Sequence, residues 1–185
     1  KNNKDIVALC ADLTESTRIE YFQEAYPDRF IEVGVAEQNL ATVAAGMALA
    51  GKIPFVSSYA AFCPGRNYEQ IRTTIALNNA NVKVVGAHAG ISVGADGATH
   101  QMLEDMSLMR ALPNMAVISP ADALDAELAT KAITEYQGPC YLRLGKDYGL
   151  YKEPYDFQIG KAHTVRDGKD VTIISTGSIL KEALE

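Results

Sequence analysis

Short apolar runs alternate with longer helical patterns along most of this chain, and this alternation is the feature that most constrains its fold. The apolar runs lie at 5–9, 30–33, 53–57, 82–86, 115–118 and 140–144. Helical patterns lie between them, at 16–25, 36–50, 68–77, 101–111 and 122–135. Continuously apolar strands connected through helices are typical of a parallel sheet with helices on both faces. We therefore expect an α/β fold built on a doubly wound, mostly parallel sheet.

The alternation ends near residue 150, so we expect a first domain at 1–150. The next segment carries glycine, proline and tyrosines without periodicity, which indicates a linker. An edge strand is predicted at 161–165, so that linker and edge strand together occupy 151–169. A buried strand at 170–175, followed by a helix start, predicts the beginning of an incomplete second α/β domain at 170–185.

Charge and hydrophobicity exclude two classes of partner. The net charge of -6 leaves no basic patch of the kind that nucleic acid requires. The longest apolar run, at 40–51, is too short to span a bilayer, and no signal peptide opens the chain. We therefore expect neither a nucleic-acid nor a membrane partner.

The three cysteines, Cys10, Cys63 and Cys140, are odd in number and widely spaced, without a CxxC pair. This pattern predicts neither a disulfide framework nor a zinc knuckle. A reducing, cytoplasmic location fits best.

Glu37 stands where a predicted strand gives way to the Ala-rich helix at 36–50. Small and apolar residues surround that helix on nearly every face, which predicts that it is buried. A carboxylate in such surroundings can take up and release a proton near neutral pH. An acid in a first helical turn also simply complements the helix dipole. Glu37 alone therefore does not decide between a chemical and a structural role.

The loop at 88–101 follows a predicted strand and carries three glycines, with His88 and His100 on either side of Asp96. Glycines let the backbone approach a ligand, and histidines exchange protons near neutral pH. The loop contains neither GxGxxG nor GK[ST], and its histidines lack the short spacing typical of zinc ligands. A solvated turn with incidental histidines is the alternative.

Tyr59 and Phe62 follow the strand at 53–57. Aromatic side chains in this place can grip a flat heteroaromatic ring, although core packing is the commoner use of such residues. Ligands of parallel α/β sheets bind beyond the carboxyl ends of the strands. Glu37, the aromatic pair and the histidine loop all follow strands, so we expect them at the same edge of the sheet.

Taken together, six short motifs resemble the pyrimidine-binding domain of transketolase, a thiamine diphosphate enzyme. They are ADLT at 11–14, GVAEQ at 34–38, PF at 54–55, DGATHQ at 96–101, RALPN at 110–114 and PADA at 120–123. Chance agreement falls multiplicatively with independent motifs, and these occur in the right order across 5–146. The resemblance implies the thiamine diphosphate-binding fold. It also implies a C-terminal section of transketolase, either a split-gene subunit or a shortened chain, with the start of the family's third domain at 170–185.

The resemblance implies a role for each residue that matches a family motif. Glu37 would hydrogen-bond N1′ of the cofactor's pyrimidine, and Tyr59 and Phe62 would pack on that ring. His88 and His100 would bind oxygens of the donor sugar and assist proton transfer.

Two further residues would recognise the substrate by the same resemblance. Asp96 would recognise a sugar hydroxyl. Lys146 stands where transketolases usually have an arginine for the substrate phosphate, and a lysine binds phosphate as a point charge without the bidentate fork. Ala95 replaces an acid that is common in the family loop.

No segment resembles the glycine-aspartate-glycine to asparagine signature that holds the cofactor's metal and diphosphate in the family. We therefore expect Mg²⁺ or Ca²⁺ to bind through a partner half, and no metal ligand in this chain. The implied partners are the diphosphate-binding transketolase half, in a homodimer or heterotetramer, and sugar phosphates.

The resemblance implies transfer of a two-carbon ketol unit from a ketose phosphate to an aldose phosphate in the pentose phosphate pathway, with activity only beside the partner half. A 1-deoxyxylulose-5-phosphate synthase shares the Ala-Glu-Gln element and the Gly-Ala-Asp-Gly loop, but His88 and the segment at 112–115 favour transketolase. The beta subunit of 2-oxo-acid dehydrogenases lacks a comparable Thr-His-Gln motif. A noncatalytic pyrimidine-domain scaffold is the last alternative, and the intact Glu37 and both histidines argue against it.

Overall fold

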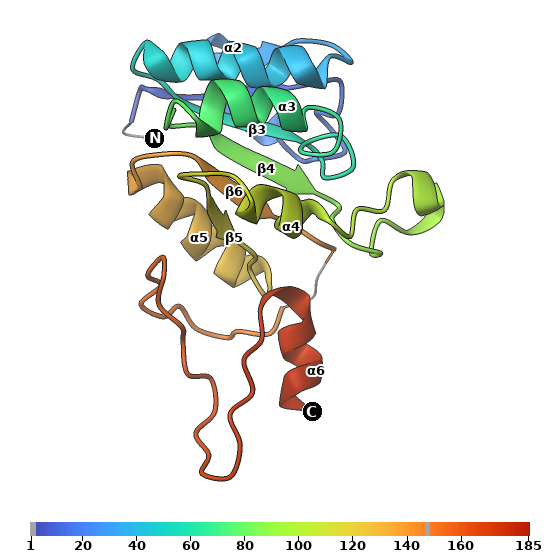
Figure 1. The fold of residues 1–185 in the computed structure, drawn as a ribbon, viewed down its shortest axis with the longest axis vertical. Helices are drawn as coiled ribbons and strands as arrows, with labels where there is room; N and C mark the ends of the chain where they lie inside the picture. The colour runs from blue at the N-terminus through green and yellow to red at the C-terminus, as the bar shows by residue number, and fades with distance from the viewer. Residues whose placement is uncertain (1–2, 147–148) are drawn as a thin grey trace.

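A computed structural model describes residues 3–146 and 149–185 of the chain (Figure 1). Its strands are β1 (Ile6–Cys10), β2 (Phe30–Glu32), β3 (Ile53–Tyr59), β4 (Lys83–Ala87), β5 (Ala116–Ile118) and β6 (Cys140–Arg143). They form one six-stranded sheet in the order β2-β1-β3-β4-β6-β5, and every pairing is parallel. The predicted parallel α/β sheet is confirmed.

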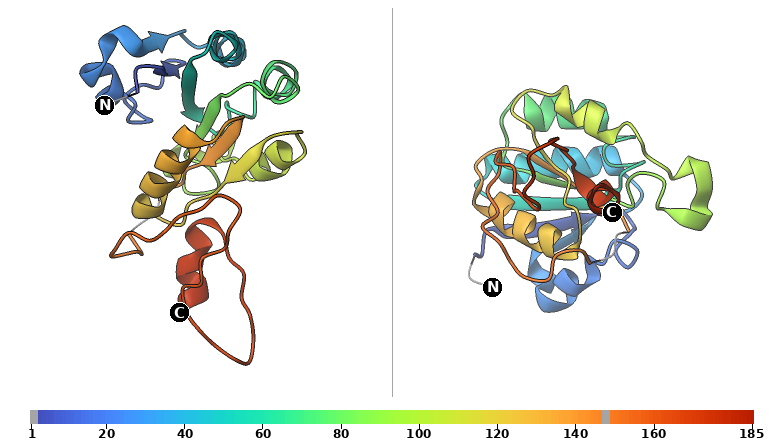
Figure 2. Two further views of the ribbon diagram at one scale, coloured as in Figure 1. Left: turned by 90° about the vertical axis from the view of Figure 1, so that its left-hand side faces the viewer. Right: turned by 90° about the horizontal axis from the view of Figure 1, so that it is seen from below.

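Helices cover both faces of this sheet. They are α1 (Glu20–Ala25), α2 (Glu37–Leu49), α3 (Tyr68–Gln70), α4 (Asp105–Arg110) and α5 (Ala123–Glu135). A further helix, α6 (Leu180–Leu184), lies away from the sheet (Figure 1). Other helical segments are η1 (Pro27–Arg29), the π-helical η2 (Ile71–Ala76), η3 (Gly94–Thr99) and η4 (Gly177–Ile179). Helices α2, α3 and α4 lie on one face of the sheet, and α1 and α5 lie on the other (Figures 1 and 2). The chain is therefore doubly wound, as expected.

Two helices begin later than their sequence patterns predict. Helix α1 starts at Glu20 rather than near residue 16, because Arg18 has a left-handed φ of 61° that interrupts a right-handed helix. Helix α4 starts at Asp105 rather than at 101, because Met102 forms a bridge with Gly90. An extended residue in that bridge cannot belong to a helix.

The core lies in two layers, one on each face of the sheet. Successive side chains of β6 point to opposite faces of the sheet. Tyr141 packs in the layer under α2, η2 and α4, and Leu142 packs in the layer under α5. On the first face, Leu40 of α2 is fully buried in the same cluster as Val56 of β3. On the second face, Ile133 of α5 is fully buried in the cluster that contains Leu142.

Helix α2 is buried on one face only, so the prediction that it is enclosed on nearly every side was wrong. Its inward residues include Leu40 and Ala44, which are fully buried. Its outer face carries exposed Gln38 and Thr42, and Leu49 is 69% exposed. The sheet and η2 cover one side of the helix. An Ala-rich pattern does not reveal this direction, since alanine is compatible with either environment.

The part of the chain beyond β6 differs from its prediction. Within the described residues 149–185, neither 161–165 nor 170–175 forms a strand, and Ile174 is 91% exposed. A strand needs a neighbour for its backbone groups, and no other strand runs beside these segments in the described structure. The predicted helix start after 175 is present as η4 and α6. The proposed domain boundaries at 150 and 170 remain predictions.

The helices in the described residues are all too short or too polar to cross a membrane.

Candidate functional site

The residues that the sequence singles out follow different strands and meet at the carboxyl edge of the sheet. Glu37 follows β2, Tyr59 ends β3, His88 follows β4 and Lys146 follows β6. The loop after β4 also brings His100 to this edge, where it contacts Phe62. In parallel sheets this edge is the usual place for a ligand crevice.

Glu37 is the first residue of α2 and is only 3% exposed. Its Oε2 accepts a hydrogen bond from Nη1 of Arg66 at 3.0 Å, which forms an ion pair with one half-exposed partner. The fully buried Asn67 donates from Nδ2 to the backbone oxygen of Glu37 at 2.8 Å. Within the described residues, Oε1 of Glu37 forms no hydrogen bond. One carboxylate oxygen is thus anchored by the protein and the other is available.

An aromatic cluster lies beside this acid. The rings of Tyr59 and Phe62 are nearly parallel, with an interplanar angle of 9° and 6.2 Å between centroids. The His88 ring lies 4.2 Å from Tyr59, and the His100 ring lies 5.3 Å from Phe62. The Arg66 guanidinium lies 5.0 Å from the Phe62 centroid, within cation–π range. Arg66 therefore connects Glu37 to the cluster formed by Tyr59, Phe62, His88 and His100.

His88 has two unusual features. Its backbone has a left-handed φ of 53°, which is rare for a residue with a side chain. Its Nδ1 is buried and has no hydrogen-bond partner in the described structure. Burial lowers the pKa of the imidazole and the Lys146 charge lowers it further, whereas Asp96 acts in the opposite direction. The lowered pKa favours the neutral imidazole near neutral pH, and a neutral ring can accept as well as donate a hydrogen bond.

Asp96 lies on the outer part of the loop, in η3, and its side chain is exposed. Backbone hydrogen bonds between Gly90 and Met102 close the base of this loop, at 2.7 and 3.3 Å. Figure 1 shows the segment with η3 projecting from the body of the molecule. The structure therefore brings Glu37, the aromatic pair and both histidines together, and leaves Asp96 open to solvent.

Lys146 lies on the other side of the same loop. Its backbone N–H donates to Oγ of Ser92 at 3.2 Å, and its Nζ donates to the Val93 carbonyl at 3.4 Å. A cavity of about 600 Å³ is lined by residues that include Arg143 and Lys146. Lys146 is thus placed to present its charge beside the loop, where that charge lowers the pKa of His88.

A buried polar network supports the loop from below. Oδ2 of Asp105, a fully buried residue at the start of α4, accepts from Tyr141 Oη at 2.8 Å and from Arg143 Nε at 2.9 Å. Burial and the neighbouring Asp105 raise the pKa of Tyr141 well above its usual value. Gly86 makes this possible, because a Cβ there would lie 2.1 Å from the Tyr141 oxygen.

The sequence analysis assigned no role to three of these residues, Arg66, Asp105 and Arg143. Arg143 carried a usable signal, since a charge inside an apolar strand run requires a buried partner. Arg66 carried none, because its segment has no clear period.

The described residues contain no group of three or more His, Cys, Asp or Glu side chains that could hold a metal ion. All three cysteines are buried and free.

Comparison with known proteins identifies the family. The family model described as transketolase, pyrimidine binding domain, matches residues 1–149. A Methanocaldococcus jannaschii protein described as a candidate transketolase C-terminal section is 46% identical over 188 residues, covering 100% of this chain and 60% of that protein. A 6-deoxy-6-sulfo-D-fructose transketolase subunit from a Clostridium species is 42% identical over 181 residues, covering 97% and 56%.

A solved structure leads to the same family. The structure described as a split-gene transketolase, inactive beta4 tetramer, superposes with a TM-score of 0.88 at 44% identity, covering 98% of this chain and 59% of that one. The chain thus spans 60% or less of the length of these relatives. These matches agree with the parallel sheet and with the motifs at its carboxyl edge. The chain belongs to the transketolase family and contains its pyrimidine-binding domain.

Proposed function

We propose that this chain is the pyrimidine-binding half of a transketolase that transfers a two-carbon ketol unit from a ketose phosphate to an aldose phosphate. The observation that carries the proposal is the buried Glu37, with one oxygen held by Arg66 and the other available beside aromatic rings. Members of this family depend on thiamine diphosphate, which supplies a nucleophilic carbon when bound.

Glu37 holds the first role in this proposal. Its Oε1 would form a hydrogen bond with N1′ of the pyrimidine and hold a proton between the two atoms, in surroundings from which water is largely excluded. The nearly parallel rings of Tyr59 and Phe62 offer apolar surface to the pyrimidine. An acid and two aromatic rings, from Glu37, Tyr59 and Phe62, fit the pyrimidine half of the cofactor.

The remaining site residues would act on the substrate. His88 and His100 would hold oxygens of the donor sugar and move protons, and the neutral state of His88 suits it to accept a hydrogen bond from a hydroxyl. Asp96, on the solvent-exposed part of the loop, would accept a hydrogen bond from a sugar hydroxyl. Lys146 would attract the phosphate as a point charge.

The other half of the site would come from a partner. The relatives that match this chain along its length are described as a C-terminal section, a subunit and a split-gene protein. We propose that a diphosphate-binding half holds Mg²⁺ or Ca²⁺ and the diphosphate, in a homodimer or heterotetramer in the cytoplasm. The pentose phosphate pathway is the proposed setting, although the Clostridium relative is named for a sulfonated sugar.

Two other functions make different predictions. A 1-deoxyxylulose-5-phosphate synthase would condense pyruvate with glyceraldehyde 3-phosphate, whereas we expect the assembled enzyme to use xylulose 5-phosphate as donor and to leave pyruvate unreacted. A noncatalytic scaffold would do neither in the presence of the partner half. Product analysis with each pair of substrates distinguishes the three functions.

The direct test is Glu37→Gln in the assembled enzyme. Glutamine keeps the size of the side chain but removes the acid, so exchange of the cofactor's C2 proton for deuterium is expected to slow about a hundredfold to ten-thousandfold. Glu24→Gln, at an exposed glutamate on α1, is the matched control and is expected to leave exchange unchanged. An exchange rate for Glu37→Gln equal to that of the control would disprove the assignment.

A further inference from the structure

Glu32, the last residue of β2, joins the two loops that follow β1 and β2. Its Oε1 accepts hydrogen bonds from the backbone N–H of Asp12 at 2.7 Å and of Gly34 at 2.8 Å. Its Oε2 accepts from Oγ1 of Thr14 at 3.0 Å. One carboxylate therefore satisfies three donors from two loops. Hydrogen bonds to an ionised acceptor are about twice as strong as neutral ones.

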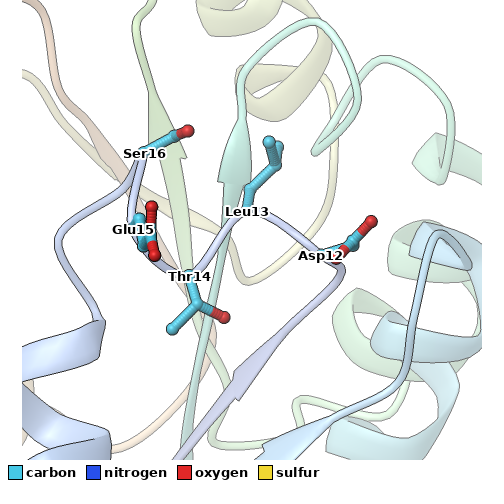
Figure 3. Close-up of a pocket in the computed structure, with 5 residues that line it drawn as sticks. All are labelled: Asp12, Leu13, Thr14, Glu15 and Ser16. Carbon is cyan, nitrogen blue, oxygen red and sulfur yellow. The ribbon is translucent and has the colours of Figure 1, made fainter.

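The loop after β1 needs such support. Asp12 has a left-handed φ of 58°, which is uncommon for a residue with a side chain and persists only where its surroundings hold it. Residues 12–16 line a cavity of about 300 Å³ (Figure 3). Thr14 lies in this segment, and its contact with Glu32 fixes one side of the loop.

The second loop leads directly to Glu37. Gly34 has a φ of 71°, and its carbonyl accepts from the N–H of Ala36 at 2.7 Å, which forms a tight turn. Helix α2 then begins at Glu37, three residues after Gly34. A change in the position of Gly34 is therefore transmitted to Glu37 with little intervening chain to absorb it.

We propose that Glu32 is a positioning residue, which sets the place of the Glu37 carboxyl group by fixing the turn before α2 to the loop after β1. This inference rests on the proposed role of Glu37 in cofactor activation. A misplacement of about 1 Å in a reacting group can cost about a hundredfold in rate. Glu32 does not touch the cofactor in this account, since its carboxylate is occupied by the two loops.

The test compares Glu32→Ala with Glu32→Gln in the assembled enzyme. Alanine removes all three hydrogen bonds, so C2 proton exchange is expected to fall about tenfold to a hundredfold. The amide protons of Asp12 and Gly34 are expected to exchange faster with solvent in the same variant. Glutamine can still accept both N–H groups and donate to Thr14, so we expect it to restore both measurements to within about threefold of the original enzyme. Glu24→Ala is the control.

Two results would overturn the inference. C2 exchange in Glu32→Ala equal to the control, with faster amide exchange at Gly34, would show that the turn does not set the position of Glu37. A loss in Glu32→Gln as large as in Glu32→Ala would show that charge, rather than hydrogen-bond geometry, matters.

A milder variant keeps the test possible if Glu32→Ala fails to assemble. Thr14→Val removes only the contact to Oε2, so it is expected to slow C2 exchange by less than Glu32→Ala, and an unchanged rate would contradict the inference. The Glu37→Gln experiment separates this inference from the proposed function. If Glu37→Gln slows C2 exchange but Glu32→Ala does not, only the positioning role fails.

Discussion

The two halves of the candidate site are built differently. Glu37 is 3% exposed and is held by Arg66 and Asn67, with α2 packed on the sheet behind it. The loop that carries Asp96 projects into solvent and is closed by backbone hydrogen bonds between Gly90 and Met102. The buried half is already formed by this chain alone. The open half presents polar groups, such as Asp96, to solvent.

This difference matches the chemistry that each half would perform. Proton control by a carboxyl group requires fixed geometry and little water, which burial provides. Recognition of a sugar requires access from solvent, so exposed groups on a loop suit it. His88 and His100 lie between the two, since both rings touch the aromatic pair and both belong to the loop segment.

The largest effect is expected from the histidines, where the two halves meet. His88→Ala and His100→Ala should each lower kcat with xylulose 5-phosphate, by about a hundredfold to ten-thousandfold if the ring transfers a proton. Steady-state kinetics of the assembled enzyme measures this. His163→Ala, outside the loop, is the control. An unchanged kcat in both variants would show that neither histidine takes part in catalysis.

The buried pair of Asp105 and Arg143, which lies beneath the exposed loop, is expected to make a large contribution to stability. Asp105→Ala leaves the Arg143 guanidinium without its buried partner and should lower the free energy of unfolding by about 3–5 kcal/mol. Glu127→Ala breaks an exposed pair with Lys131 and should cost about 0.5 kcal/mol or less. Urea denaturation compares the two variants. Equal losses would show that the loop does not depend on this network.

A smaller effect is expected from Lys146, at the edge of the open half. Lys146→Ala should raise the KM for phosphorylated substrates about tenfold, which corresponds to about 1.4 kcal/mol of binding. The kcat should stay the same, because a distant charge contributes to binding more than to chemistry. Lys152→Ala provides the control on a neighbouring lysine. An unchanged KM would show that Lys146 does not bind the substrate phosphate.

Much of the fold could be predicted from the sequence. Alternating apolar runs predicted every strand up to β6, and the motifs after them led to the residues at the carboxyl edge. Strand runs succeed because a strand covered on both faces of the sheet is mostly apolar, as in β1. The segment at 170–175 also contains β-branched apolar residues, Val171, Ile173 and Ile174, but it forms no strand, because strand formation also requires a pairing neighbour.

The contacts within the site could not be predicted in the same way. The ion pair between Glu37 and Arg66 joins residues 29 positions apart, and the contact between Asp105 and Arg143 joins residues 38 apart. Pairings over such separations depend on how the elements pack and leave no local pattern. The exposed face of α2 was not predicted either, because its small residues are compatible with both buried and exposed positions.

The central claim is that this chain supplies only the pyrimidine half of a thiamine diphosphate site. Calorimetric titration of thiamine diphosphate with Mg²⁺ into the purified chain, alone and mixed with a diphosphate-binding half, tests it most directly. The chain alone is expected to bind weakly or not at all, and the mixture is expected to bind tightly and gain activity. Tight, Mg²⁺-dependent binding by the chain without any partner would contradict the account.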